Sequence, residues 1–327
     1  MALSPKDLIV IRVEANETIG FGHFMRMLAM GQALSKLGFV IQFYMTNCNH
    51  QLSNLLDQHG FSLFEAKTSA TSTNSSNDDL FLAFCRLKNP ICVVLDGESF
   101  SQNLEKNLRQ LEFKTIRILD LPDSKSHADL IINPNFGAEN FHNLHNSKSK
   151  LALGIKFSLL RDEFQKSLRP SSVAPPTKKQ ILVSLGASQL QTSYLYDLFE
   201  NFAKANSELF SFQILRGVKL ERISEIMLVS DFAFIAAGVT MWESMKLGLP
   251  FHAIALTSDQ ISYLELMKSH NLWFGHTKHN ELDHDLILKI VNSYFSRSDL
   301  AVEFLSRYNS LEIGSETQQL LSEFLIR

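Results

Sequence analysis

The hydrophobic pattern at the start of the chain predicts a strand, a glycine-rich turn and a helix. Residues 8–13 are mostly apolar and β-branched, which is typical of a buried strand. Residues 19–23 form the turn, and residues 25–37 have apolar positions at helical spacing until Gly38 ends the helix. A second strand is expected at residues 39–45.

Strands and helices continue to alternate through the first half. Short apolar runs predict strands at residues 91–95, 115–119 and 130–132, with helices at 52–58 and 103–111. This alternation predicts a parallel sheet that is covered by helices on both faces. The polar run at residues 67–79, with five consecutive Ser, Thr or Asn residues at 72–76, predicts a surface loop.

A change in composition marks the boundary between two domains. Residues 169–179 are rich in Pro and Ser and are expected to form a linker. The alternation then begins again, with strands expected at 180–184, 210–215, 232–236 and 251–256 and helices at 193–204 and 242–246. The sequence therefore predicts two doubly wound α/β domains, at residues 1–170 and 178–327, each binding ligands at the carboxyl ends of its strands.

Composition and charge exclude several classes of function. The chain has 327 residues, of which 45% are hydrophobic and 20% are charged, as in a folded globular protein. Its net charge of −3 provides no broad positive field for nucleic acid or anionic lipid. The three cysteines match no zinc or thioredoxin spacing, and no apolar run has the length of a membrane span. We therefore expect a cytoplasmic protein without a nucleic-acid partner and without membrane insertion.

The first glycine-rich turn, Gly20-Phe21-Gly22-His23, places a titratable side chain at a helix start. It does not match the dinucleotide-binding fingerprint, because His follows the second Gly and no acidic residue ends the second strand. His23 has three interpretations: a helix cap, a packed histidine, or a base. The ordinary pKa of imidazole, about 6.5, suits a base that acts at neutral pH.

A second cluster follows the strand expected at residues 232–236. There, Gly238 would let the backbone approach a diphosphate, and Thr240 offers a hydroxyl group. Glu243 lies three positions beyond Thr240, which is the spacing of a capping box. The alternative is that Glu243 accepts both hydroxyls of a ribose, because a carboxylate has two acceptor oxygens.

Several segments occur in a specific order along nearly the whole chain. They are Arg-Val-Glu-Ala at 12–15, Ile-Gly-Phe-Gly-His-Phe-Met-Arg at 19–26, Leu-Leu-Arg-Asp-Glu-Phe at 159–164, Val-Ser-Leu-Gly-Ala-Ser at 183–188, Ala-Gly-Val-Thr-Met-Trp-Glu at 237–243, Gly-Leu-Pro at 248–250, and Gln260. In these segments the chain resembles the nucleotide-sugar hydrolases of the pseudaminic acid pathway, which release UDP from a diacetamido trideoxy sugar, and related spore-coat polysaccharide proteins. That resemblance implies the GT-B architecture, in which two Rossmann-like domains flank a cleft. It is shared with the glycosyltransferases that build the peptidoglycan lipid intermediate.

The resemblance also implies roles for individual residues. It makes His23 the catalytic residue that deprotonates the attacking water, with Gly20 and Gly22 shaping its turn and Arg26 in the same segment. The UDP-binding residues that it implies are Gly186, Ala187, Ser188, Ala237, Gly238, Val239 and Thr240 at the diphosphate, Glu243 at the ribose, and Gln260 near the cleft. No metal and no cofactor are expected, because helix N-termini can neutralise part of the diphosphate charge.

The chain departs from the family pattern at three places. The family often has Asp-His-Tyr where this chain has Asp96-Gly97-Glu98, and a paired Asp-Asp where it has Asp120-Leu121. Its phosphate turn reads Gly-Ala-Ser-Gln at 186–189 in place of Gly-Gly-Ser/Thr-Asp. The first two differences lie in the half that would hold the sugar. Asp96 and Asp120 are either acceptors for sugar hydroxyls or caps of turns.

Three interpretations of function follow. The main one is hydrolysis of the anomeric C–O bond of a UDP-linked acetamido deoxy sugar, with UDP and the free sugar as products. The alternatives are a GT-B glycosyltransferase, in which an acceptor hydroxyl replaces water, and a protein that binds sugar nucleotides without turnover. A metal site at His276, His279 and His284 is the less favoured interpretation, since these residues are expected in an exposed, charged loop without any cysteine.

Overall fold

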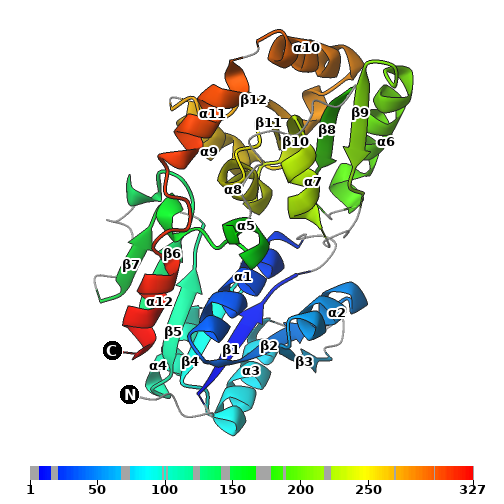
Figure 1. The fold of residues 1–327 in the computed structure, drawn as a ribbon. Coiled ribbons are helices and arrows are strands. Elements are labelled where there is room, and N and C mark those ends of the chain that lie inside the picture. Colours follow the sequence, from blue (N-terminus) through cyan, green and yellow to red (C-terminus); the bar gives the residue numbers. More distant parts are fainter. Residues whose placement is uncertain are drawn as a thin grey trace. The chain divides into compact units, whose positions relative to one another are not determined.

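The computed structural model describes residues 7–15, 21–67, 74–97, 99–100, 102–120, 126–140, 148–166, 178–186, 189–216, 222–268, 270–297 and 299–326. The chain forms two compact units (Figure 1). The first is built from the opening strand, His23–Arg161 and Gly314–Arg327, and the second mainly from Asp162–Ile313.

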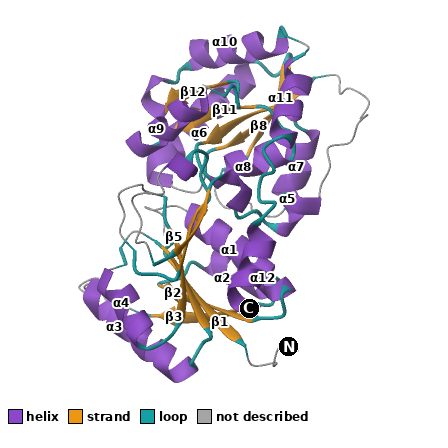
Figure 2. Cartoon of the chain, turned by 90° about the vertical axis from the view of Figure 1, so that its left-hand side faces the viewer, coloured by secondary structure: helices purple, strands orange, loops and turns teal. Residues whose placement is uncertain are grey.

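The first unit contains, within the described ranges, a seven-stranded parallel sheet of order β3-β2-β1-β4-β5-β6-β7. Its strands are β1 (Leu8–Val13), β2 (Val40–Thr46), β3 (Ser62–Ala66), β4 (Cys92–Asp96), β5 (Lys114–Ile118), β6 (Leu130–Asn133) and β7 (Lys150–Leu153). Its helices are α1 (Gly22–Lys36), α2 (His50–Gln58), α3 (Asn74–Lys88), α4 (Gln102–Gln110) and α12 (Thr317–Ile326). Figure 2 shows α3 and α4 on one face of the sheet and α1, α2 and α12 on the other.

The second unit contains, again within the described ranges, a five-stranded parallel sheet of order β12-β11-β10-β8-β9. Its strands are β8 (Lys179–Ser184), β9 (Phe210–Ile214), β10 (Phe232–Ala236), β11 (Phe251–Ala255) and β12 (Gly275–Lys278). Its helices are α5 (Asp162–Lys166), α6 (Gln189–Ala205), α7 (Ile223–Val229), α8 (Val239–Lys246), α9 (Ser258–Lys268), α10 (His284–Phe295) and α11 (Leu300–Asn309). The sequence expectation of two parallel α/β domains is confirmed.

The strand orders locate the topological switch point of each sheet, where successive strands begin to be added on the opposite side of the first strand. In the first unit, the chain moves from β1 to β2 and β3 on one side and later to β4 and β5 on the other. In the second unit, β8 is likewise followed by β9 on one side and by β10 on the other. Ligands of open α/β sheets bind outside the carboxyl ends of the strands at such points. The carboxyl ends of β1 and β4 and of β8 and β10 are therefore the expected ligand sites of the two sheets.

The last helix returns to the first unit. Gly314 N–H donates to Ile155 O at 3.1 Å, and the Thr317 hydroxyl donates to Ser158 O at 3.2 Å. Gln318 also donates to Ala33 O. These long-range bonds, together with the inclusion of α5 in the second unit, make the observed division differ from the expected domains at 1–170 and 178–327.

The polar run at residues 67–79 is not a loop throughout, because α3 begins at Asn74. The reason is a buried ion pair: Asp78 Oδ1 lies 2.8 Å from Arg12 Nη1, and both side chains are almost fully buried. A carboxylate that pairs with an arginine of β1 fixes this part of the run against the sheet. Residues 68–73 lie outside the described ranges.

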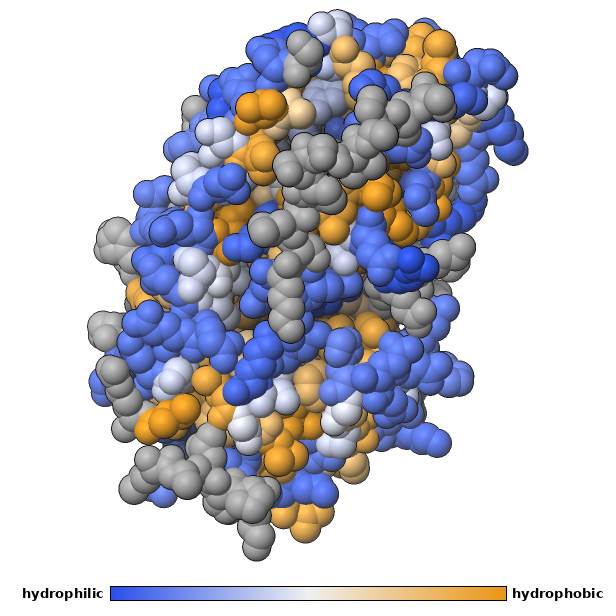
Figure 3. Space-filling model, viewed as in Figure 1, coloured by the Kyte–Doolittle hydropathy of each residue, from blue (hydrophilic) through white to orange (hydrophobic). Residues whose placement is uncertain are grey.

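The surface gives no sign of a membrane-spanning segment in the described residues, since none of their helices is both long and apolar enough to cross a bilayer. On the face seen in Figure 3, hydrophilic side chains outnumber hydrophobic ones. Leu87 and Val302, at 81% and 72% exposed, are among the exposed apolar side chains on helices. Such scattered positions are normal for globular proteins and need no further explanation.

Candidate functional site

His23 is the second residue of α1, which begins at Gly22 directly after the turn that follows β1. It lies inside the first helical turn, so it is not the residue that caps the helix. Its side chain is 19% exposed, and its buried Nδ1 atom has no hydrogen-bond partner. Nδ1 lies 3.8 Å from Asp96 Oδ1, which is too long for a hydrogen bond but close for an electrostatic interaction.

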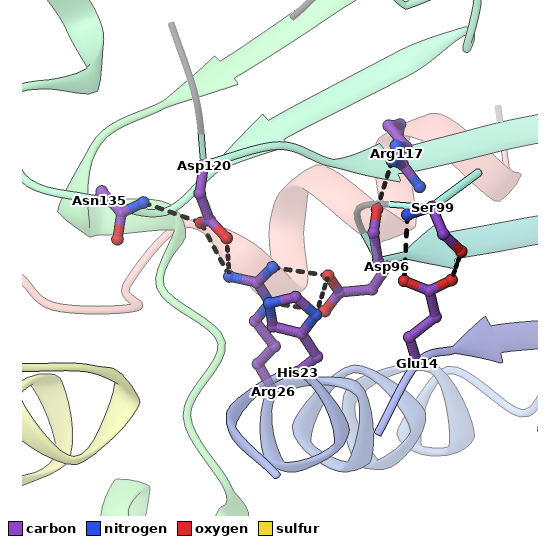
Figure 4. A network of polar contacts seen from close by, with 9 residues as sticks. Glu14, His23, Arg26, Asp96, Ser99, Arg117, Asp120 and Asn135 are labelled. Atoms are coloured by element: carbon purple, nitrogen blue, oxygen red, sulfur yellow. Dashed lines mark hydrogen bonds and ion pairs between the residues drawn. The ribbon is translucent and has the colours of Figure 1, made fainter. Parts of the chain in front are cut away.

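Arg26, one turn further along α1, is clamped between two carboxylates (Figure 4). Its Nε and Nη2 atoms donate to the two oxygens of Asp96 at 2.5 and 2.6 Å, in a bidentate pair. Its Nη1 atom donates to Asp120 Oδ1 at 2.8 Å, and Asn135 donates to the same oxygen at 2.9 Å. Residues at the carboxyl ends of β4, β5 and β6 and in the first turns of α1 therefore form one network of hydrogen bonds.

The electrostatics of this network leave an excess of negative charge. Burial alone would lower the pKa of Arg26, but Asp120 and Asp96 outweigh it and raise that pKa above its usual value. Burial also opposes ionisation of Asp120, but the charges of Arg26 and His23 and the hydrogen bonds to the carboxylate lower its pKa below the usual value. One guanidinium thus faces two carboxylates, and the His23 imidazole lies beside them.

The structure gives different roles to Asp96 and Asp120, which had the same two interpretations in the sequence analysis. Asp96 is completely buried and gives both oxygens to Arg26, so it orients its neighbours and is not open to a sugar hydroxyl. The side chain of Asp120 is 36% exposed, so it can still accept a hydrogen bond from a ligand. Neither carboxylate acts as a mere cap of a turn, because both bind Arg26.

A second row of charges holds the segment that follows β4. Arg117 on β5 donates to Gly97 O at 2.5 Å, and Ser99 donates to the Glu14 carboxylate through both its N–H and its hydroxyl (Figure 4). The Arg117 guanidinium also lies 5.0 Å from the centre of the Phe100 ring. Burial lowers the pKa of Arg117, although nearby carboxylates oppose this effect.

Sequence reasoning missed Arg117, Glu14 and Asn135, although a signal was present for the first. Arg117 lies between two buried, apolar neighbours in β5, as Arg12 does in β1. A charged residue among the buried positions of a parallel strand must have a partner, because an unpaired buried charge costs several kcal/mol. No comparable signal marks Asn135, which lies in the bend after β6.

In the second unit, two of the expected diphosphate turns occupy the switch point between β8 and β10. Gly186 follows β8 with a φ of +78°, and Gly238 follows β10 as the N-cap of α8. A Cβ atom at either position would meet nothing within 4 Å. Neither glycine is therefore required by neighbouring protein atoms, which leaves space for a ligand. Gly20, Ala187 and Ser188 lie outside the described residues.

The capping-box interpretation of Glu243 is wrong. Gly238 is the N-cap, so Thr240 is already inside the first turn of α8 and cannot be the capping residue. Ala237 is buried, while Val239 and Thr240 are partly exposed at the helix start. Glu243 is only 2% exposed and has a polar partner. Its expected contact with a ribose stays a prediction.

Two other expectations change. The amide oxygen of Gln260 accepts a hydrogen bond from Leu256 N–H at 2.7 Å, so this side chain also shapes the turn after β11. The histidine tract is not a loop: His276 lies in β12 and is paired with Glu265 at 3.0 Å, and His284 begins α10. Strand pairing with β11 organises this segment.

Comparison with known proteins identifies the fold. No family model matches the chain. An uncharacterized protein of Methanocaldococcus jannaschii is 23% identical over 274 residues, which cover 74% of this chain and 54% of that protein. The chain thus spans about half the length of the curated relative it matches.

Among solved structures, similar folds cover nearly the whole chain. Acinetobacter baumannii MurG has a TM-score of 0.63 at 13% identity, covering 98% of this chain and 99% of that one. A spinosyn rhamnosyltransferase complexed with thymidine diphosphate has 0.63 at 12%, covering 96% and 99%. A putative UDP-N-acetylglucosamine 2-epimerase from Listeria monocytogenes has 0.66 at 10%, covering 98% and 97%.

The chain has the GT-B fold. This confirms the architecture expected from the sequence. Identities of 10–13% show the fold alone, so the narrower assignment to the nucleotide-sugar hydrolases stays a prediction.

Proposed function

We propose that the chain transfers a glycosyl group from a nucleoside-diphosphate sugar, with His23 as the base that deprotonates the acceptor. The placement of His23 carries this proposal. It lies at the switch point of the first sheet, beside a buried carboxylate network that has more negative than positive charge. The open turns at Gly186 and Gly238 are the proposed diphosphate site on the second unit.

The proposed step balances in protons and electrons. His23 Nδ1 faces Asp96, so Nε2 is the nitrogen left to take the proton of the acceptor O–H group. The acceptor oxygen then bonds to the anomeric carbon, and the bond from that carbon to the diphosphate oxygen breaks. The electron pair leaves with the nucleoside diphosphate, whose charge the helix N-terminal N–H groups favour. The imidazolium that forms lies beside the Asp96 carboxylate, whose Oδ1 is 3.8 Å from Nδ1.

Two acceptors are compatible with this chemistry. The similarity in fold to a structure named as a rhamnosyltransferase supports an acceptor hydroxyl, and hence a glycosyltransferase. The sequence motifs around His23 and Gly238 support water as the acceptor, and hence a hydrolase acting on a UDP-linked acetamido sugar. We favour the glycosyltransferase because the solved structures of similar fold support it.

The products formed from a panel of UDP- and dTDP-sugars test the proposal. Release of nucleoside diphosphate that requires an added extract of hydroxyl-bearing acceptors is expected for a glycosyltransferase. Stoichiometric free sugar without any acceptor would instead identify a hydrolase. If no donor is turned over under either condition, the proposed glycosyl transfer is contradicted.

Replacing Gly238 by Ala tests the diphosphate turn. The φ of −155° is open to any residue and the Cβ position is free, so stability should change by about 1 kcal/mol or less. Affinity for UDP should fall by roughly tenfold or more, because the methyl group would intrude on a closely packed ligand. Calorimetric titration with UDP and a thermal melt measure the two effects.

Gly248→Ala is the matched control in the same unit. Gly248 has a φ of +70°, and Leu305 occupies the position that its Cβ would take. This variant should therefore melt at a lower temperature and bind UDP with unchanged affinity. Equal UDP affinity in wild type and Gly238→Ala would remove Gly238 from the diphosphate site.

A further inference from the structure

The hydroxyl of Tyr196 makes two hydrogen bonds to the backbone of the turn after β8. It accepts from Leu185 N–H at 3.1 Å and donates to Gly186 O at 3.0 Å. Tyr196 lies in α6, eleven and ten residues beyond its two partners, and is only 2% exposed. One buried side chain therefore ties both peptide groups at the point where β8 leaves the sheet.

The position of this turn gives the contact its significance. It lies at the switch point of the second sheet, where β10 and β9 flank β8. Gly186 is exposed, has a φ of +78°, and has open space where a Cβ would project. The turn is thus held from the protein interior by Tyr196 and is open on the side where a ligand can approach.

The chemistry of the hydroxyl suits this double role. Burial raises the pKa of Tyr196 to about 12, so at neutral pH the phenol keeps the proton that it donates to Gly186 O. The Arg216 guanidinium lies 5.8 Å from the centre of the Tyr196 ring and is bonded to Asp197 and Ser193 of the same helix. Burial therefore fixes the ring of Tyr196, and the two hydrogen bonds to the backbone fix its hydroxyl.

We infer that Tyr196 is a positioning residue for nucleotide binding, which fixes the turn after β8 in the conformation that receives the diphosphate of the donor. The inference rests on the proposed function. Tyr196 itself does not touch the ligand, because its hydroxyl is occupied by the backbone on the interior side. It acts through the peptide groups of Leu185 and Gly186, which its hydroxyl holds by two hydrogen bonds.

Calorimetric titration of wild type and Tyr196→Phe with UDP and with dTDP tests this inference. The substitution keeps the buried ring and removes both hydrogen bonds, leaving Leu185 N–H without its partner. We expect the dissociation constant to rise roughly 5- to 30-fold, the range that corresponds to one or two lost hydrogen bonds. On a donor that is turned over, KM should rise by a similar factor while kcat at saturation stays within about twofold, because His23 is unaffected.

Tyr294→Phe is the matched control, since Tyr294 is a buried tyrosine of the same unit whose hydroxyl donates to Asp231 O at 3.2 Å. It should lose stability without losing affinity. The inference is overturned if Tyr196→Phe binds as tightly as wild type, or if both variants lose affinity equally. Wild type that binds neither nucleotide would overturn the proposed function, and with it this inference.

Discussion

Replacing His23 by Ala should lower kcat by roughly 10²–10⁴-fold, the usual contribution of a general base. The imidazole is placed in the first turn of α1 and is not its cap, so its removal should leave the helix intact. The nucleotide is proposed to bind on the second unit, so UDP affinity should stay within about twofold of wild type. Steady-state kinetics and calorimetric titration measure the two effects on the same preparation.

Two controls separate catalysis from structure in this experiment. His284→Ala changes an exposed histidine at the start of α10 and should keep the wild-type rate. Added imidazole should restore part of the activity of His23→Ala, because a small base can occupy the vacated space. A His23→Ala variant that keeps the wild-type kcat on a donor that is turned over would remove His23 from the mechanism.

Replacing Arg26 by Gln should lower the free energy of unfolding by roughly 3–5 kcal/mol, the cost of leaving a buried charge without its partner. Arg26 is the shared partner of Asp96, which is completely buried, and of Asp120. In the wild-type protein Arg26 lowers the pKa of Asp120 below its usual value, so its removal should raise that pKa. Denaturant unfolding, monitored by circular dichroism, measures the loss.

The sign of the pH dependence gives this prediction a second test. An acid whose folded-state pKa is lowered, as that of Asp120 is by Arg26, stabilises the fold above its unfolded-state pKa and loses this contribution as the pH falls through the folded-state pKa. The deficit of Arg26→Gln relative to wild type should therefore shrink when the pH is lowered from 7 to about 3. Adding Asp96→Asn should restore part of the stability at pH 7, while Arg297→Gln, at an exposed ion pair, should hardly change the unfolding midpoint. A deficit independent of pH would contradict the buried-charge account.

The sequence predicted the fold well where the elements are short and their hydrophobic pattern depends on neighbouring residues alone. The strands of both sheets were predicted to within one or two residues at β1, β2, β4, β5, β6, β8, β9, β10 and β11. Their periodicity reflects burial on both faces, which is a local property of parallel strands. The start of α3 was missed because it depends on contacts such as the pairing of Asp78 with Arg12, which is 66 residues away.

In the candidate site, too, the sequence predicted which residues are present but not which contacts they make. His23, Arg26, Asp96 and Asp120 were all named from the sequence: His23 from its place after the glycine-rich turn, and the other three from segments compared with the family that the chain resembles. Their different roles could not be predicted from the sequence, since Arg26 binds both oxygens of Asp96 while the side chain of Asp120 stays 36% exposed. The role of Tyr196 could not be predicted either, because its two backbone hydrogen bonds depend on how α6 packs against the turn after β8.

The position of bond cleavage tests the central claim most directly. A donor found in the panel, prepared with ¹⁸O at the oxygen that bridges the anomeric carbon and the diphosphate, is incubated with the wild-type protein and its acceptor. If His23 activates an acceptor that attacks carbon, the C–O bond breaks and all of the label is found in the released nucleoside diphosphate by mass spectrometry. Label retained in the sugar product would place the attack at phosphorus and contradict the proposed glycosyl transfer.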